Sequence, residues 1–168
     1  MSAGIIGIDP SLTATGICTD DGWWTVYDPD GGDHRLWVIH IDVTMALTGH
    51  TPPRLVIMED LPTHGKGAGK TGMAQGVIRL ALQQQQVPYL TVTAATLKKF
   101  ATGRGNAPKP DLRMELYKRA ELDLADDNQV DAWWLHQIGL HLIGAGDRLT
   151  LPKTHLEALD KINKPVIA

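Results

Sequence analysis

Two short apolar runs that each end on an acid constrain the fold of this chain more than any other feature. The runs are GIIGID (4–9) and RLVIME (54–59), and their last residues are Asp9 and Glu59. Apolar runs of this length, bounded by turn signals, are typical of strands buried on both faces of a sheet. The sequence therefore predicts a sheet with at least two buried strands, both of which carry an acid at the carboxyl end.

The rest of the pattern predicts how this sheet is completed. TGICT (15–19) and GWWTVY (22–27) are separated by a turn and favour a hairpin that pairs with the first strand. PYLTVT (88–93) predicts another buried strand. The expected helices span 34–48, 73–86 and about 127–143, with a further helical region from 94 on that TGRGNAPKP interrupts. Hairpins first and βα crossovers later indicate an α/β fold, with a mixed five-stranded sheet and helices on both faces.

Length and composition favour one ordinary globular domain. The chain has 168 residues, of which 43% are hydrophobic and 21% charged. We expect a domain at 1–146 and a C-terminal tail at 147–168, where THLEALDKI predicts a short helix. No run approaches the roughly 18 apolar residues of a membrane span, and no signal-peptide pattern opens the chain. We therefore expect a cytoplasmic protein without a membrane partner.

The single cysteine, Cys18, excludes an internal disulfide and a zinc site built from cysteines. Because it lies in an apolar stretch, we expect it to be a small buried hydrophobic residue.

The charges are distributed unevenly along the chain. The net charge is −3, yet the segment 98–119 holds seven bases and two acids, a local charge of +5. Such a segment fits either a footprint for a phosphate backbone or a solvated helix face. The bases are Lys98, Lys99, Arg104, Lys109, Arg113, Lys118 and Arg119.

The stretch HGKGAGKTG (64–72) looks like a phosphate-binding P-loop but lacks its spacing. The motif G-x-x-x-x-G-K-[ST] needs a glycine five residues before Gly69, and that position holds His64. The sequence therefore predicts no nucleotide cofactor. The expected alternative is a mobile loop at 63–71, in which Lys66 and Lys70 can contact the backbone of a ligand.

A second group of acids lies at the start of the last predicted helix. Asp127 and Asp131 share one helix face, as do Asn128 and Asp131. Right-handed crossovers would place the strands that end at Asp9 and Glu59 side by side. One such acid alone is explained by a helix cap or an ion pair, but three converging stretches are not. Clustered carboxylates raise one another's pKa unless a cation neutralises them, which favours a magnesium site and, with two ions, phosphodiester hydrolysis.

Five motifs occur in an order and spacing that resemble one known family. They are GIDPSLTATG (7–16), VIMED (56–60), GMAQGVIRLAL (72–82), TLKKFATGRGNAPK (96–109) and DNQVDAWW (127–134). Over about residues 4–143 the chain is similar to RuvC-type Holliday junction resolvases of the RNase H-like, or retroviral-integrase, superfamily. The likeness is weakest at 28–50, and it favours a phage-encoded member.

The resemblance also implies roles for individual residues. Asp9 matches the first catalytic acid, which would bridge two metal ions, and Glu59 and Asp131 match the second and last acids. The family often has Asp or His where this chain has Asn128, so either Asn128 or its neighbour Asp127 would be the fourth metal ligand. Asp60 is expected to cap a loop. The implied DNA-binding residues are Lys66, Lys70, Lys98, Lys99, Arg104 and Lys109, of which Lys98 and Lys109 match bases that the family holds near the active site.

The function that the resemblance implies is a magnesium-dependent, structure-selective endonuclease that cuts Holliday junctions and other branched DNA. Mn²⁺ would substitute for Mg²⁺, and a homodimer is expected because a symmetric junction needs two matched cuts. Two alternatives remain open at this point. One is an RNase H-like protein that binds junctions without cutting them, and the other is a nuclease that acts on flaps or RNA–DNA hybrids.

Overall fold

A mixed five-stranded sheet forms the centre of the computed structural model, which describes residues 3–49, 52–61 and 68–162. The strands are β1 (Ile5–Asp9), β2 (Thr15–Thr19), β3 (Gly22–Val26), β4 (Leu55–Glu59) and β5 (Tyr89–Val92). Their order in the sheet is β3-β2-β1-β4-β5. The first three strands form an antiparallel meander, whereas β1, β4 and β5 run parallel to one another. The predicted hairpin and the predicted parallel neighbours are both confirmed.

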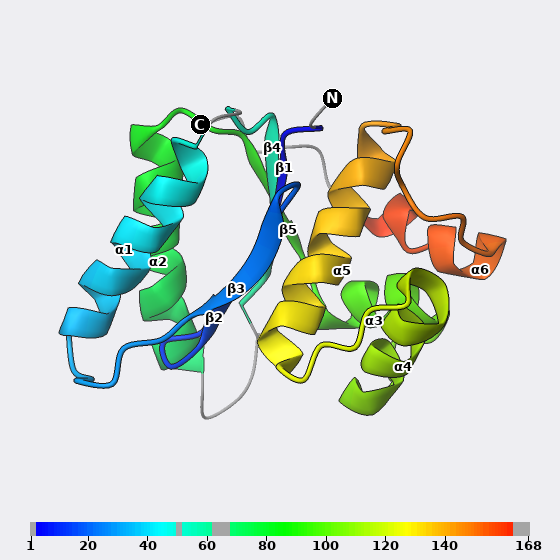
Figure 1. The fold of residues 1–168 in the computed structure, drawn as a ribbon, viewed down its shortest axis with the longest axis horizontal. Coiled ribbons are helices and arrows are strands. Elements are labelled where there is room, and N and C mark those ends of the chain that lie inside the picture. The colour runs from blue at the N-terminus through cyan, green and yellow to red at the C-terminus, as the bar shows by residue number, and fades with distance from the viewer. Residues whose placement is uncertain (1–2, 50–51, 62–67, 163–168) are drawn as a thin grey trace.

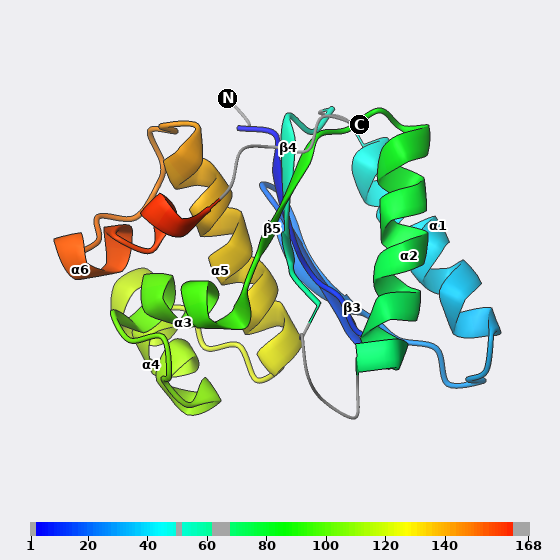
Figure 2. The same cartoon turned by 180° about the vertical axis from the view of Figure 1, so that it is seen from behind.

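Helices cover both faces of this sheet, as predicted. They are α1 (His34–Leu47), α2 (Ala68–Gln84), α3 (Ala94–Thr102), α4 (Lys109–Ala120), α5 (Asp127–Leu142) and α6 (Lys153–Leu156), followed by a 3-10 turn at Leu159–Lys161. Helices α1 and α2 lie on one face, and α3, α4, α5 and α6 lie on the other (Figures 1 and 2). In the described part of the chain no helix combines the length and apolar character that a membrane crossing requires.

Alternation along the strands divides the interior into two cores. Ile6 and Ile8 of β1 pack with the α1 and α2 side, whereas Ile5 packs with the α5 side. In β4, Ile57 also faces α5, while Val56 and Met58 face the other core. Successive strand side chains point to opposite faces, so Asp9 and Glu59 share the face of Ile5 and Ile57. Both acids therefore lie under α5. Cys18 is buried in the same core as Ile5, as expected.

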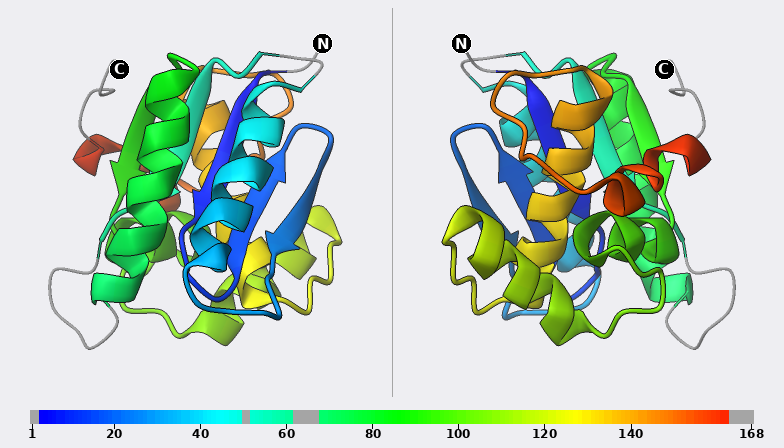
Figure 3. Two further views of the ribbon diagram at one scale, coloured as in Figure 1. Left: turned by 90° about the vertical axis from the view of Figure 1, so that its left-hand side faces the viewer. Right: turned by 90° about the vertical axis from the view of Figure 1, so that its right-hand side faces the viewer.

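Two glycines allow α5 to lie directly on the sheet. A Cβ atom at Gly7 of β1 would collide with the backbone oxygen of Ala132, and one at Gly16 of β2 would collide with that of Asn128. Figure 3 shows α5 crossing the strands on the side opposite α1 and α2. The absence of these two side chains sets the height of the first turns of α5 above the strands.

Helix α2 begins earlier than the sequence pattern predicted. The expected loop at 63–71 is wrong for its last part, because Ala68 through Thr71 already belong to α2. Glycine lowers helix propensity by about 1 kcal/mol relative to alanine, so Gly69 and Gly72 mask the helix start in the pattern. Burial of Ala74 and Ile78 against the sheet outweighs this penalty. Residues 62–67, which include His64 and Lys66, lie outside the described part.

The C-terminal segment packs on α3. His155 bonds through Nδ1 to the backbone oxygen of Phe100 at 2.8 Å, and the ammonium of Lys99 donates to Glu157 at 3.2 Å. Leu151 and Ala158 are buried in the core that contains Phe100. The tail thus shares its apolar contacts with the body of the protein.

Candidate active site

Three carboxylates from three separate segments meet at one end of the sheet. Asp9 and Glu59 are the last residues of the parallel neighbours β1 and β4. Asp131 lies in the second turn of α5, and this helix starts at the end of the molecule where those strands finish (Figure 1). One carboxylate oxygen from each of the three acids lies within 4.8 Å of the other two. The convergence expected from the sequence is therefore present.

These acids line a pocket of about 150 Å³ together with two lysines. Lys98 comes from α3 and Lys109 from the first residue of α4, with Pro110 after it as expected for a helix start. The remaining lining residues are Ala94, Leu97 and Leu112. Apolar side chains in the lining lower the local dielectric, which strengthens every charge interaction in the pocket.

Burial raises the pKa of all three carboxyl groups, and repulsion from neighbouring carboxylates adds to this effect. The pKa of Asp9 is raised well above its usual value by burial and then by the charges of Glu59 and Asp131. Burial and the charge of Asp131 raise the pKa of Glu59 to about 7. Burial also raises the pKa of Asp131, although the ammonium of Lys109 opposes this change. Without a further positive charge, the site retains protons that free carboxyl groups would have lost.

Lys109 supplies part of the missing positive charge. Its Nζ lies 3.4 Å from an oxygen of Asp131. Burial alone would lower the pKa of Lys109, but the carboxylates of Asp131 and Asp9 outweigh burial and raise it. Lys109 therefore stays an ammonium, which suits it to hold an anionic group and not to accept a proton.

The two candidates for a fourth ligand lie at the start of α5. Asp127 is exposed and is not part of the three-carboxylate group, although its charge raises the pKa of Asp131. Asn128 donates both its backbone N–H and its side-chain amide to Oδ1 of Asp126, at 2.9 and 2.7 Å. The amide nitrogen of Asn128 is therefore committed to the helix cap. Asp60 accepts a bond from the backbone N–H of Leu61 at 2.9 Å, in keeping with the local capping role expected for it.

The other predicted DNA-binding residues are spread around the pocket. Lys70 is exposed in the first turn of α2, and Lys66 lies outside the described residues. Lys99 is paired with Glu157, and Arg104 is paired with Asp111 at 2.7 Å. Of the residues named as DNA contacts, Lys98 and Lys109 line the carboxylate pocket.

One contact beside the site was missed by the sequence analysis. The hydroxyl of Thr25 on β3 donates to Oδ2 of Asp126 at 2.5 Å and ties the hairpin to the start of α5. Hydrogen bonds from Thr25 and Asn128 lower the pKa of Asp126 despite its partial burial. An aspartate just before a helical pattern is a recognisable capping signal. Thr25 carries no such signal, because its partner is 101 residues away.

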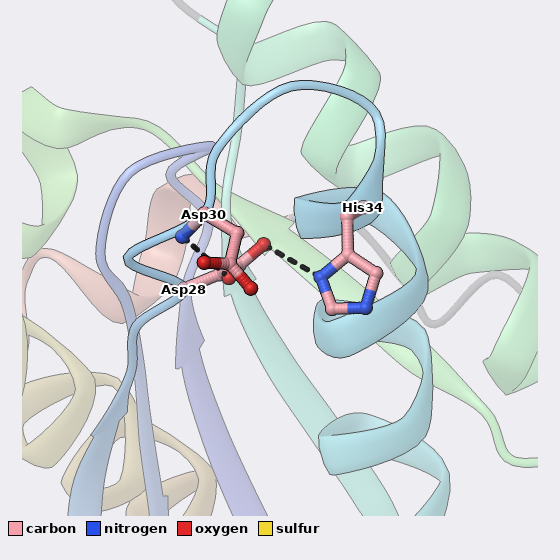
Figure 4. A group of neighbouring side chains, drawn as sticks. All are labelled: Asp28, Asp30 and His34. Carbon is pink, nitrogen blue, oxygen red and sulfur yellow. Dashed lines mark hydrogen bonds and ion pairs between the residues drawn. The ribbon is translucent and has the colours of Figure 1, made fainter.

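A second group of metal-ligand types, Asp28, Asp30 and His34, is accounted for by local structure. Asp28 accepts a bond from the backbone N–H of Asp30 at 3.0 Å and pairs with Nδ1 of His34 at 2.9 Å (Figure 4). Both oxygens of Asp28 are thus used in the turn that leads into α1. Asp30 and His34 are exposed.

Fold and site together define an RNase H-like α/β protein with a three-carboxylate centre. No protein-family model matches the chain. A structure of T. thermophilus RuvC in complex with a Holliday junction substrate superposes with a TM-score of 0.67, covering 87% of this chain and 98% of that one at 20% identity. Another structure of Thermus thermophilus RuvC superposes with a TM-score of 0.65. At this identity the likeness establishes the fold.

Sequence relatives establish the family. Crossover junction endodeoxyribonuclease RuvC from Chlamydia trachomatis is 32% identical over 115 residues, which cover 65% of this chain and 67% of the relative. The protein of the same name from Polynucleobacter necessarius is 31% identical over 123 residues, covering 68% of this chain and 73% of the relative. The chain belongs to the RuvC family.

Proposed function

We propose that this protein is a metal-dependent endonuclease that resolves Holliday junctions. The observation that carries the proposal is the meeting of Asp9, Glu59 and Asp131 in a pocket bordered by Lys98 and Lys109. Membership of the RuvC family supports it, because the relatives are named as crossover junction endodeoxyribonucleases. A protein of the same fold binds a Holliday junction substrate.

The side chains at the centre fit a divalent cation. Asp9 and Glu59, which are partly buried, and Asp131, which is buried, have raised pKa values, so this donor set is stable in its charged form only beside added positive charge. Hard oxygen donors favour Mg²⁺, and Mn²⁺ accepts the same ligands. Asp9, Glu59 and Asp131 would hold the metal, and Asp127 or the side-chain oxygen of Asn128 would be the fourth ligand. Bound Mg²⁺, as one ion or two, would supply an activated water for attack on a backbone phosphate.

The lysines hold the substrate. Lys109 and Lys98 present ammonium groups at the wall of the pocket, where the scissile phosphate would lie. Because Lys109 keeps its proton, it stabilises negative charge on the phosphate as the bond to the leaving oxygen breaks. Lys70, Lys99 and Arg104 would contact phosphates of the junction arms, and such contacts make affinity depend on salt.

The substrate favours a homodimer in solution. A four-way junction is resolved by two symmetric cuts, and two copies related by a twofold axis provide two matched centres. The chain alone supplies one centre, formed by Asp9, Glu59 and Asp131.

The test compares three labelled substrates with wild type and Asp9→Asn, in Mg²⁺ or in chelator. The substrates are a four-way junction, a flap and an RNA–DNA hybrid. We expect paired nicks on the junction that require Mg²⁺, and at least a 100-fold loss of cleavage in Asp9→Asn with binding retained. Asp60→Asn is the matched control, because Asp60 lies next to Glu59 but outside the three-carboxylate group.

The other outcomes would refute the assigned site or indicate a different function. Cleavage by Asp9→Asn at the wild-type rate would refute the assigned site. Tight junction binding with no cutting would identify a scaffold that binds junctions, and preferred cutting of flaps or hybrids would identify another RNase H-like nuclease.

A further inference from the structure

A buried glutamine on α2 contacts the end of strand β4. Gln75 is 1% exposed, and its side-chain Nε2 donates to the backbone oxygen of Glu59 at 2.7 Å. Helix α2 lies on the face of the sheet opposite α5. The Glu59 carboxylate therefore lies on one side of the sheet, while its own backbone is held from the other side.

The orientation of this amide is fixed by its second partner. Oε1 of Gln75 accepts a bond from Nη2 of Arg79, one helical turn further on, at 3.0 Å. The Arg79 guanidinium lies over the ring of Tyr89 on β5, 5.8 Å from the ring centre. Since a guanidinium only donates, the amide must direct its oxygen to Arg79 and its nitrogen to Glu59. Tyr89, Arg79 and Gln75 thus form a continuous series of contacts from β5 to the end of β4.

The neighbouring strand holds the same residue from the side. Glu59 pairs with Val92 of β5, and the backbone N–H of Asp60 donates to the oxygen of Val92 at 2.8 Å. The β5 contacts fix Glu59 within the plane of the sheet, and the Gln75 bond fixes it from above that plane. A displacement of about 1 Å at a catalytic group can lower a rate about 100-fold, so this second restraint matters for a metal ligand.

We propose that Gln75 is a positioning residue for Glu59, and that Arg79 orients the Gln75 amide. Gln75 itself touches neither metal nor DNA. It keeps the end of β4 at the height from which the Glu59 carboxylate meets those of Asp9 and Asp131. The inference rests on the proposed function, because it assigns Glu59 to a metal site.

The test titrates each variant with Mg²⁺ and follows the unfolding temperature. The titration gives an apparent dissociation constant for Mg²⁺. Gln75→Met keeps about the same side-chain length and volume but cannot donate a hydrogen bond to Glu59. We therefore expect its apparent dissociation constant for Mg²⁺ to rise about tenfold. Single-turnover cleavage at subsaturating Mg²⁺ should fall about 10- to 100-fold, while junction binding in chelator stays unchanged. Gln83→Met is the matched control, because Gln83 is exposed on the same helix, and it should behave as wild type.

Two further variants test the geometry. Gln75→Glu can still pair with Arg79 but, when ionised at pH 8, has no proton to donate to the Glu59 oxygen. It should reproduce the Mg²⁺ defect even if Gln75→Met folds poorly. Arg79→Met leaves the amide free to rotate and should give a smaller defect of the same kind.

If Gln75→Met and Gln75→Glu both keep the wild-type apparent dissociation constant for Mg²⁺, the inference is overturned. A lower unfolding temperature with an unchanged Mg²⁺ constant would also overturn it, because that result describes packing alone. Failure of the proposed function is distinguishable, since wild type itself would then show neither stabilisation by Mg²⁺ nor cleavage.

Discussion

At the scale of single residues, the site is a set of acids that destabilise one another. Burial and the charge of Asp131 raise the pKa of Glu59 to about 7, and burial with the charges of Glu59 and Asp131 raises the pKa of Asp9 well above its usual value. In the metal-free protein near neutral pH, part of the folding free energy is therefore spent on holding these charges together.

Glu59→Gln should stabilise the metal-free protein at high pH. The folded pKa of Glu59 lies above its usual value of 4.5, so its contribution is fully present below about pH 4.5 and is lost as pH rises through about 7. The amide cannot ionise, so it escapes this loss. The free energy of unfolding in chelator at pH 8 should be higher for Glu59→Gln than for wild type, by a few kcal/mol at most, since one pKa unit corresponds to about 1.4 kcal/mol.

The same variant gives its own controls. At pH 4, below the usual pKa of the group, the difference should nearly vanish, and added Mg²⁺ at pH 8 should stabilise wild type but not Glu59→Gln. An equal difference at both pH values would mean that the variant acts through packing and not through charge.

Single residues were predictable where periodicity or the family resemblance placed them. Asp9 and Glu59 end apolar runs, and the start of the last helix offered several acids, among which the family resemblance selected Asp131. Gln75 and Thr25 were not predictable. Each acts through one bond to a residue 16 or 101 positions away, and one sequence carries no record of such pairs.

At the scale of elements, the distance between α5 and the sheet decides whether the site exists. Gly7 and Gly16 lie within the motif GIDPSLTATG. Because neither has a Cβ atom, the backbone of α5 can approach the strands at both positions. Asp131 approaches Asp9 because the helix backbone rests on these two glycines.

Gly16→Ala should therefore damage both stability and metal binding. The added methyl group meets the backbone oxygen of Asn128, and the first turn of α5 must move away from β2. Overpacking of this kind costs about 1–3 kcal/mol, which corresponds to roughly 2–12 °C in unfolding temperature for a chain of this size. The stabilisation by Mg²⁺ should fall as well, because Asp131 moves with the helix.

Gly76→Ala is the matched control. Gly76 lies in α2 with open space where a Cβ would stand, and alanine there should raise stability by up to about 1 kcal/mol through helix propensity. A Gly16→Ala protein with wild-type stability and Mg²⁺ response would show that α5 is not held at this height by contact.

Most elements were predictable because their burial patterns are strong. The strands match the predicted runs to within about one residue at each end, and the last helix ends one residue early. The predicted start of α2 was wrong because helix propensity is local, whereas the burial of Ala74 and Ile78 is a tertiary effect.

At the scale of the whole molecule, the tail belongs to the side of the sheet that carries the site. His155, Leu151 and Ala158 contact α3 or the core around it, and α3 supplies Lys98 to the pocket. The fold class was predictable from the order of hairpin and crossovers. The docking of the tail was not, since THLEALDKI offers an apolar face without saying what it meets.

A chain ending at residue 146 should unfold at a lower temperature than the full chain. Loss of the tail removes Leu151 and Ala158 from the core that contains Phe100, and it removes His155, the hydrogen-bond partner of the Phe100 backbone oxygen. Full burial of one large apolar side chain contributes about 1.5–3 kcal/mol, so we expect the free energy of unfolding to fall by several kcal/mol. Equal unfolding temperatures for 1–146 and the full chain would instead support the predicted domain boundary at 146.

The parallel pairing of β1 with β4 and the late position of α5 also have a consequence during synthesis. A nascent chain that has left the ribosome only as far as α4 already contains Asp9, Glu59 and both pocket lysines, but not Asp131. The three-carboxylate group is thus completed by α5, which is translated after the other elements that line the pocket. Under the proposed function, products of interrupted translation would carry the basic segment without the complete set of three carboxylates, and we expect them to bind DNA without cutting it.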